Sequence, residues 1–196
     1  QRQSSTLAQL LTPVFGTPDN DTLATTGEWQ VVYGRAGDDR LSSAFNHTTM
    51  AGGTGDDTLL VELDLVEDER IPLVEVEASA KGGAGDDTIS MNVTSFSDFG
   101  PEAVLNVSAS GGAGSDIINV STISDEFGDS VVQNTIYGDS GHDVITAHAV
   151  GGDFFGDAST AINEIYGGSG DDRITATAVV FSNSSRLAKN YLDGGS

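Results

Sequence analysis

The side chains best suited to chemistry are aspartates that recur with glycines in one nine-residue phrase, as in Gly82-Gly-Ala-Gly-Asp-Asp-Thr-Ile-Ser90. In the seven readable copies the sixth position is always Asp, and the eighth is always Leu or Ile. The sixth-position aspartates are Asp21, Asp39, Asp57, Asp87, Asp116, Asp143 and Asp172. A catalytic carboxylate pair is normally unique in a chain, whereas a carboxylate repeated in every copy indicates a repeated cation ligand.

The glycines at the first, second and fourth positions allow backbone conformations that a Cβ would forbid, so several carbonyl oxygens can point into one turn. One turn offers too few oxygens for a cation that takes about six to eight ligands. When turns stack about 4.8 Å apart, as neighbouring strands do, each gap is lined with oxygens from both turns. Besides the aspartates, the predicted ligand-bearing residues are Gly34, Ala36, Gly37, Gly52, Gly53, Thr54, Gly55, Gly82, Gly83, Ala84, Gly85, Gly111, Gly112, Ala113, Gly114, Gly138, Ser140, Gly141, Gly167, Gly168, Ser169, Gly170 and Gly194.

The donor set selects among cations. All of the predicted ligands are hard oxygens, and the chain has no Cys and only three unpatterned histidines, so zinc is disfavoured. Magnesium demands tight octahedral geometry and keeps its waters, which a carbonyl-rich turn serves poorly. The sequence therefore predicts calcium.

The spacing of the copies identifies the elements that position them. The copies begin at residues 16, 34, 52, 82, 111, 138 and 167, with a truncated one at Gly194, so the spacing runs from 18 to 30 residues. Eighteen residues suffice for two short strands and two tight turns, one coil of a solenoid. After each Asp the residues alternate, as in inward Ile89, Met91 and Val93, and a second strand (76–80, 105–109 and 132–136) leads into later turns. We predict an all-β parallel β-roll, or β-helix solenoid, with Gly/Asp turns on one edge and longer loops on the opposite edge.

Smaller regularities support this register. Asn134, Asn163 and Asn190 each lie four residues before a motif glycine, which predicts an inward asparagine ladder along the axis. Loops predicted on the opposite edge carry Phe beside Gly and Asp, at Phe99, Phe127, Phe154 and Phe155. They either cover that edge or form a second cation row or partner-binding stripe. Leu7, Leu10 and Leu11 have helical spacing, so residues 1–14 are a short N-terminal cap or a linker.

Composition excludes several functions. The formal charge of -22, from 30 acidic and 8 basic residues, opposes nucleic-acid binding, which needs a Lys/Arg surface. There is no cysteine and no apolar run of 18 residues, so neither a disulfide nor a transmembrane segment is expected. His47, His142 and His148 fit no catalytic pattern, and no enzymatic activity is predicted. The chain begins without Met and ends in a truncated motif, which we interpret as a fragment of a longer protein.

The nine-residue phrase resembles the nonapeptide of repeat-in-toxin (RTX) proteins over residues 15–196. The resemblance implies a right-handed parallel β-roll with calcium between the turns of adjacent coils, held by sixth-position carboxylates and motif carbonyls. It also implies a secreted or cell-surface protein, exported unfolded by a type I pathway. This chain departs from the usual pattern because its other edge lacks the motif, so we expect a single row of five to seven calcium ions.

Three roles fit these features. The first is a calcium-rigidified structural segment of a large adhesin, surface-layer or matrix protein, whose open coil ends could stack on neighbouring repeats or on further copies. The second is a non-catalytic accessory module of a secreted protease, lipase or polysaccharide-modifying enzyme. The third is a glycan-binding segment that uses the long Phe-bearing loops.

Overall fold

The computed structural model describes residues 12–66, 73–97, 102–126, 129–152, 158–181 and 185–196. This part of the chain is built from strands and turns, and it contains no helix that could cross a membrane. The strands are β1 (Val14–Phe15), β2 (Thr22–Ala24), β3 (Val31–Ala36), β4 (Arg40–Ser43), β5 (Thr48–Thr54), β6 (Thr58–Val66), β7 (Leu73–Ala84), β8 (Thr88–Ser97), β9 (Glu102–Ala113), β10 (Ile117–Glu126), β11 (Ser130–Ser140), β12 (Val144–Gly152), β13 (Ala158–Ser169), β14 (Arg173–Phe181) and β15 (Ser185–Asp193).

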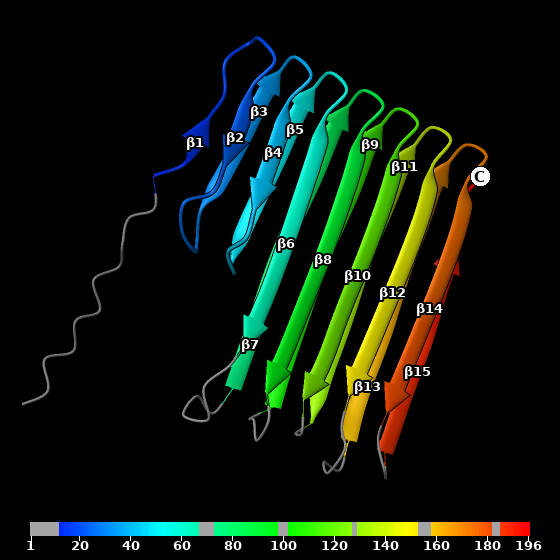
Figure 1. Ribbon diagram of the computed structural model, residues 1–196. Helices are drawn as coiled ribbons and strands as arrows, with labels where there is room; N and C mark the ends of the chain where they lie inside the picture. The colour runs from blue at the N-terminus through cyan, green and yellow to red at the C-terminus, as the bar shows by residue number, and fades with distance from the viewer. Residues whose placement is uncertain (1–11, 67–72, 98–101, 127–128, 153–157, 182–184) are drawn as a thin grey trace, which may run out of the picture.

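The strands form two parallel sheets that face each other. The odd-numbered strands make an eight-stranded sheet and the even-numbered strands a seven-stranded sheet, each in sequence order. The chain therefore alternates between layers and advances one strand at a time, which confirms the predicted parallel β-roll. In Figure 1 the even strands run down in front and the odd strands run up behind as the chain advances to the right, the sense of a right-handed coil. The Gly/Asp turns line one edge, and the described connections at residues 25–30 and 44–47 lie on the other (Figure 1).

The register pairs each motif position with the equivalent position of the next copy, whether the copies are 18 or 30 residues apart. The eighth-position residues pair in one unbroken series along the seven-stranded sheet, and this series is Leu23, Leu41, Leu59, Ile89, Ile118, Ile145 and Ile174. A shift of one residue would turn every one of these side chains toward solvent, so burial of the series fixes the register.

The core is a narrow apolar file between the sheets. In the strands away from the two ends of the roll, alternate residues point inward and are buried, as predicted for Ile89, Met91 and Val93 of β8. Inward Ala178 in β14 is only partly buried, because β14 is the last strand of the seven-stranded sheet and lacks a neighbour on one side. Neighbouring coils thus bury one another, and no coil has a core of its own.

The predicted asparagine ladder is present inside the roll. Asn134 Nδ2 donates to Asn163 Oδ1 at 2.8 Å, and Asn163 Nδ2 donates to Asn190 Oδ1 at 2.8 Å. Each of these amides also reaches the facing sheet, since Asn163 Nδ2 lies 2.8 Å from the carbonyl oxygen of Thr177. The ladder therefore bonds successive coils along the axis and ties the two sheets together across it.

The opposite edge is tightened by hydroxyl groups in the short coils. Thr25 Oγ1 donates to Ser43 Oγ at 2.9 Å, and Ser43 Oγ lies 2.9 Å from Thr48 Oγ1. The predicted Phe residues of the longer connections, and most of the proposed cap at residues 1–14, lie outside the described residues. Those two interpretations remain predictions.

Replacing the central amide of the ladder tests its contribution. Asn163→Ala removes the acceptor of Asn134 and the donor to Asn190 in a buried position, so the free energy of unfolding should fall by about 2 kcal/mol or more. Chemical unfolding in calcium measures the change. Asn119→Ala, on the exposed face of β10, is the matched control and should stay within about 0.5 kcal/mol of the parent. Equal losses in both variants would contradict a role for the ladder.

Candidate metal centre

The Gly/Asp turns depend on glycine for two different reasons. The second and fourth positions have left-handed backbone, with φ of +126° at Gly83 and +134° at Gly85. Arg35 and Asp139 occupy the second position with φ of +90° and +77°, so side chains are tolerated there at some cost. The first-position glycine has no such φ and is required by space. The expectation that all three glycines serve backbone conformation was therefore wrong for the first position.

The space at the first position is filled by oxygens. A Cβ on Gly82 would clash with Oδ2 of Asp87 in its own coil and lie 2.6 Å from the carbonyl oxygen of Gly111 in the next coil. A Cβ at the first-position glycines Gly34, Gly52, Gly138 or Gly167 would likewise meet the Asp Oδ2 of its own coil and a glycine carbonyl oxygen of the next coil. One carboxylate and one carbonyl from adjacent coils thus face a common space inside the edge.

The sixth-position aspartates form a continuous hydrogen-bonded ladder. The backbone N–H of Asp87 donates to Oδ1 of Asp116 at 2.8 Å, and the N–H of Asp116 donates to Oδ1 of Asp143 at 2.8 Å. The same bond joins Asp21 to Asp39, Asp39 to Asp57, Asp57 to Asp87 and Asp143 to Asp172. All seven predicted aspartates are therefore brought onto one edge, and each one after Asp21 uses one carboxylate oxygen to hold the preceding coil.

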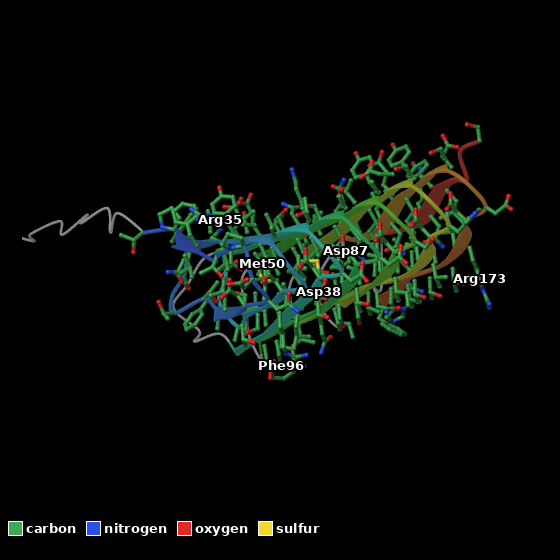
Figure 2. All side chains as sticks on the ribbon, turned by 90° about the horizontal axis from the view of Figure 1, so that it is seen from above. Arg35, Asp38, Met50, Asp87, Phe96 and Arg173 are labelled. Carbon is green, nitrogen blue, oxygen red and sulfur yellow. The ribbon has the colours of Figure 1, made fainter. Side chains whose placement is uncertain are left out.

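The other carboxylate oxygen has no protein partner. Oδ2 is buried without a hydrogen bond in six of the sixth-position aspartates described here, namely Asp39, Asp57, Asp87, Asp116, Asp143 and Asp172. A buried, unpaired carboxylate oxygen is costly unless a cation or a proton compensates it. Figure 2 looks down on this edge and shows Asp87 between the two layers, with Phe96 and Arg173 projecting outward.

The third-position carbonyls, predicted as ligands, already have partners within the turn edge. The amide of Gly85 donates to the carbonyl oxygen of Ala113 at 2.8 Å, and that of Gly55 donates to Ala84 at 2.8 Å. Ser140 and Ser169 accept the corresponding bonds from Gly114 and Gly141. A carbonyl oxygen has two lone pairs, so these bonds leave one open for a cation.

A second ladder runs along the fifth positions in the reverse direction, and sequence reasoning missed it. The N–H of Asp86 donates to Oδ1 of Asp56 in the preceding coil at 2.8 Å, and the N–H of Ser115 donates to Oδ1 of Asp86 at 2.7 Å. His142 takes the place of the carboxylate in its coil, because its Nδ1 accepts the N–H of Asp171 at 2.9 Å. The preference for Asp or another acceptor at this position was the available signal.

The two ends of the row differ from its middle. Asp21 Oδ2 accepts hydrogen bonds from the Thr17 N–H at 2.6 Å and from Thr17 Oγ1 at 2.9 Å, so it is not left unpaired. At the other end Gly194 is exposed, and a Cβ there would meet open space. The degenerate first copy and the truncated last copy are therefore the incomplete turns, in agreement with the sequence.

The carboxylates of the row influence one another electrostatically. Burial, reinforced by the neighbouring Asp116 and Asp57 carboxylates, raises the pKa of Asp87 to about 7 despite a favourable hydrogen bond. Burial likewise raises the pKa of Asp57 and of Asp116 to about 6. Below these pKa values the metal-free row holds protons, which a cation would displace.

The chemistry of the edge fits a hard cation. Within the described residues, no three His, Cys, Asp or Glu side chains converge on one point. An ion between two turns would therefore take one carboxylate oxygen from each sixth-position Asp and complete its shell with backbone carbonyls. Calcium accepts such a mixed set of carboxylate and carbonyl oxygens.

The geometry thus defines a parallel β-roll with one oxygen-lined edge, and comparison with known families identifies the repeat. The model of the RTX calcium-binding nonapeptide repeat matches four copies, at residues 15–47, 79–90, 133–149 and 157–178. The chain therefore carries RTX calcium-binding repeats, as the resemblance indicated. The copies beginning at Gly52 and Gly111 lie outside the matched residues but join the same aspartate ladder. No curated protein and no solved structure matches the chain.

Backbone space in the turns is testable with one methyl group. Gly85→Ala places a Cβ at φ +134° against the backbone of Gly55, so the roll should lose more than about 2 kcal/mol of stability in calcium. Gly27→Ala is the control, because a Cβ there meets nothing within 4 Å. Thermal unfolding of both variants provides the measurement, and an unchanged melting temperature for Gly85→Ala would be evidence against the stacked turns.

The pH dependence of the metal-free chain follows from the raised pKa values. The folded pKa of Asp87, about 7, exceeds the ordinary 3.8, so the metal-free roll binds more protons than the unfolded chain between these values. Its stability should therefore rise as the pH falls from about 7 toward 4, and the penalty should be complete above 7. Circular dichroism in chelator at a series of pH values checks this. Asp87→Asn should flatten the dependence, and a roll that is most stable at high pH in chelator would contradict it.

Proposed function

We propose that the Gly/Asp edge binds a single row of calcium ions and that this binding folds the roll. Each ion sits between adjacent turns, held by sixth-position carboxylates together with carbonyls of the motif glycines and third-position residues. The observation that carries the proposal is the file of buried Oδ2 atoms without partners. From Asp39 to Asp172 these six oxygens flank five gaps, and the incomplete turns at either end raise the upper limit to seven ions.

The charge of the chain supports a coupling between binding and folding. Five calcium ions would bring the formal charge from -22 to -12, and seven would bring it to -8. Self-repulsion of the metal-free chain opposes a compact state, and neutralisation along one edge removes most of it. The free energy of binding is then largely free energy of folding.

The role that we propose is structural and non-catalytic. The segment belongs to a large secreted or cell-surface protein of the adhesin, surface-layer or matrix type, exported unfolded by a type I pathway and folded outside the cell. The match to the RTX calcium-binding repeat supports this placement. Extracellular calcium modules bind with dissociation constants of about 10⁻⁴–10⁻³ M, which leaves such a segment unfolded at cytosolic calcium.

Calcium titration followed by circular dichroism tests the central claim. The chain should be largely unfolded in chelator at pH 8 and convert cooperatively to β structure as calcium rises, with a midpoint near 10⁻⁴–10⁻³ M. Magnesium at the same concentrations should have little effect, because it holds its hydration waters. A spectrum that is the same in chelator and in calcium would sink the proposal.

Two aspartate variants assign the site. Asp116→Asn keeps an acceptor for the ladder but puts an amide where Oδ2 faces the gap, so isothermal titration calorimetry should show at least one fewer bound ion. Asp86→Asn, at the exposed fifth position of the preceding coil, keeps its acceptor for Ser115 and should bind the full number. Equal stoichiometry in the two variants would remove the sixth-position carboxylates from the ligand set.

A further inference from the structure

The outer face of the eight-stranded sheet carries a trough that the calcium edge does not use. It encloses about 580 Å³, within the range of small-ligand sites, and extends over β3, β5, β7, β9 and β11. Successive strands lie about 4.8 Å apart, so the trough crosses five strands over roughly 19 Å along the axis of the roll. It is therefore elongated rather than round.

The register explains the shape of the trough. One row of small outward side chains forms the floor, where Thr49 pairs with Ser79, Ser79 with Ser108 and Ser108 with Thr135. The adjacent row carries the longer side chains of Glu77, Asn106 and Gln133, which pair in the same way. Short hydroxyls beside a raised row of amides and one carboxylate leave a channel with donors and acceptors along its length.

An aromatic platform closes one end of the trough. The ring of Trp29 stacks on that of His47, with centroids 3.7 Å apart and planes inclined by 8°, and Trp29 is still 59% exposed. Both residues have left-handed backbone, with φ of +59° and +55°. Non-glycine residues hold this conformation only where surrounding contacts impose it, and such strain is concentrated at functional sites.

Asn46 supplies those contacts. Its Nδ2 donates to the carbonyl oxygen of Glu75 at 2.7 Å, and its Oδ1 accepts the N–H of Glu77 at 3.0 Å and that of His47 at 2.8 Å. The turn that bears His47 is thus bonded to β7, and the N–H of Trp29 donates to the carbonyl of Asn46 at 3.4 Å. The platform is fixed before any ligand arrives, which lowers the entropic cost of binding.

The lining has the chemistry of a carbohydrate site. It consists of hydroxyl and amide side chains, an exposed indole, the imidazole of His47, a few aliphatic groups and one carboxylate, and it contains no Lys or Arg. An anionic ligand would meet no Lys or Arg there, and the one imidazole, that of His47, lies 3.7 Å from the Glu77 carboxylate on a chain of net charge -22. An extended peptide would find a sheet face rather than a free strand edge, so backbone pairing is not offered. A sugar ring can present its apolar face to the part of the indole that His47 leaves exposed, and its hydroxyls to the floor.

We propose that this trough binds a neutral, linear glycan, with one sugar ring on Trp29 and the following rings over the Thr49–Ser79–Ser108–Thr135 floor. The site lies on the sheet face, whereas the glycan site considered from the sequence lay in the Phe-bearing loops. It goes beyond the calcium function, and calcium enters only because the floor is assembled from strands of five successive coils.

Trp29 is the only tryptophan of the chain, so its fluorescence reports on this site alone. The probes are cellohexaose, maltohexaose, xylohexaose and mannohexaose, each titrated into the calcium-loaded protein, with hexagalacturonate as the anionic counterpart. At least one neutral hexasaccharide should change the emission saturably, and hexagalacturonate should not. A proline-rich decapeptide is titrated in parallel.

Paired variants locate the binding. Trp29→Ala should weaken the affinity about tenfold or more, measured by calorimetry, whereas Phe181→Ala removes an exposed aromatic of β14 and should leave it unchanged. Ser108→Tyr fills the floor and should abolish the fluorescence change. Ser121→Tyr makes the same substitution on the outer face of β10 and should not. Circular dichroism in calcium verifies folding, and Ser108→Tyr decides the matter if Trp29→Ala does not fold.

Three results would overturn the proposal. The first is the absence of a saturable change with every neutral hexasaccharide. The second is equal affinity in Ser108→Tyr and Ser121→Tyr. The third is saturable binding of the decapeptide or of hexagalacturonate in place of the neutral sugars. Because calcium-induced folding is measured separately, any of these leaves the proposed calcium function intact.

Discussion

Buried carboxylates one rung apart impose the constraint on which the rest of the roll depends. Each complete Gly/Asp turn holds an aspartate whose Oδ1 bonds the preceding coil and whose Oδ2 has no partner in the protein. The ladder needs this spacing, and the spacing brings like charges together where water is scarce, which raises the pKa of Asp87 to about 7. The thin apolar core between the sheets contributes too little stabilising free energy to offset such a cost easily. The row of calcium ions that we propose would remove this cost.

Much of this architecture follows from the sequence because the copies of the repeat can be compared with one another. Seven copies with invariant Asp and Leu/Ile specify parallel strands, their inward faces and their register without any long-range guess. Asn134, Asn163 and Asn190 were predictable as a ladder for the same reason, since equal offsets from a motif glycine become neighbouring positions on adjacent coils. In a solenoid, sequence period translates directly into spatial stacking.

Features that do not repeat, or that depend on hydrogen-bond direction, could not be predicted in this way. The opposed ladders of the fifth and sixth positions rest on which amide meets which carboxylate, and composition does not encode that choice. The first-position glycine is explained by the crowding of oxygens from two coils, visible only when both are placed. Trp29 and His47 occur once each in their coils, so no internal comparison marks them, and their stacking follows from a turn pinned by Asn46.

The constancy of the register has an implication for how such chains change over time. Copies separated by 18 residues and copies separated by 30 stack in the same alignment. Unequal recombination between any two equivalent codons would delete or duplicate a whole rung while leaving both junctions correctly paired. Such chains can lengthen or shorten in single genetic steps. The Gly/Asp edge imposes no fixed number of coils.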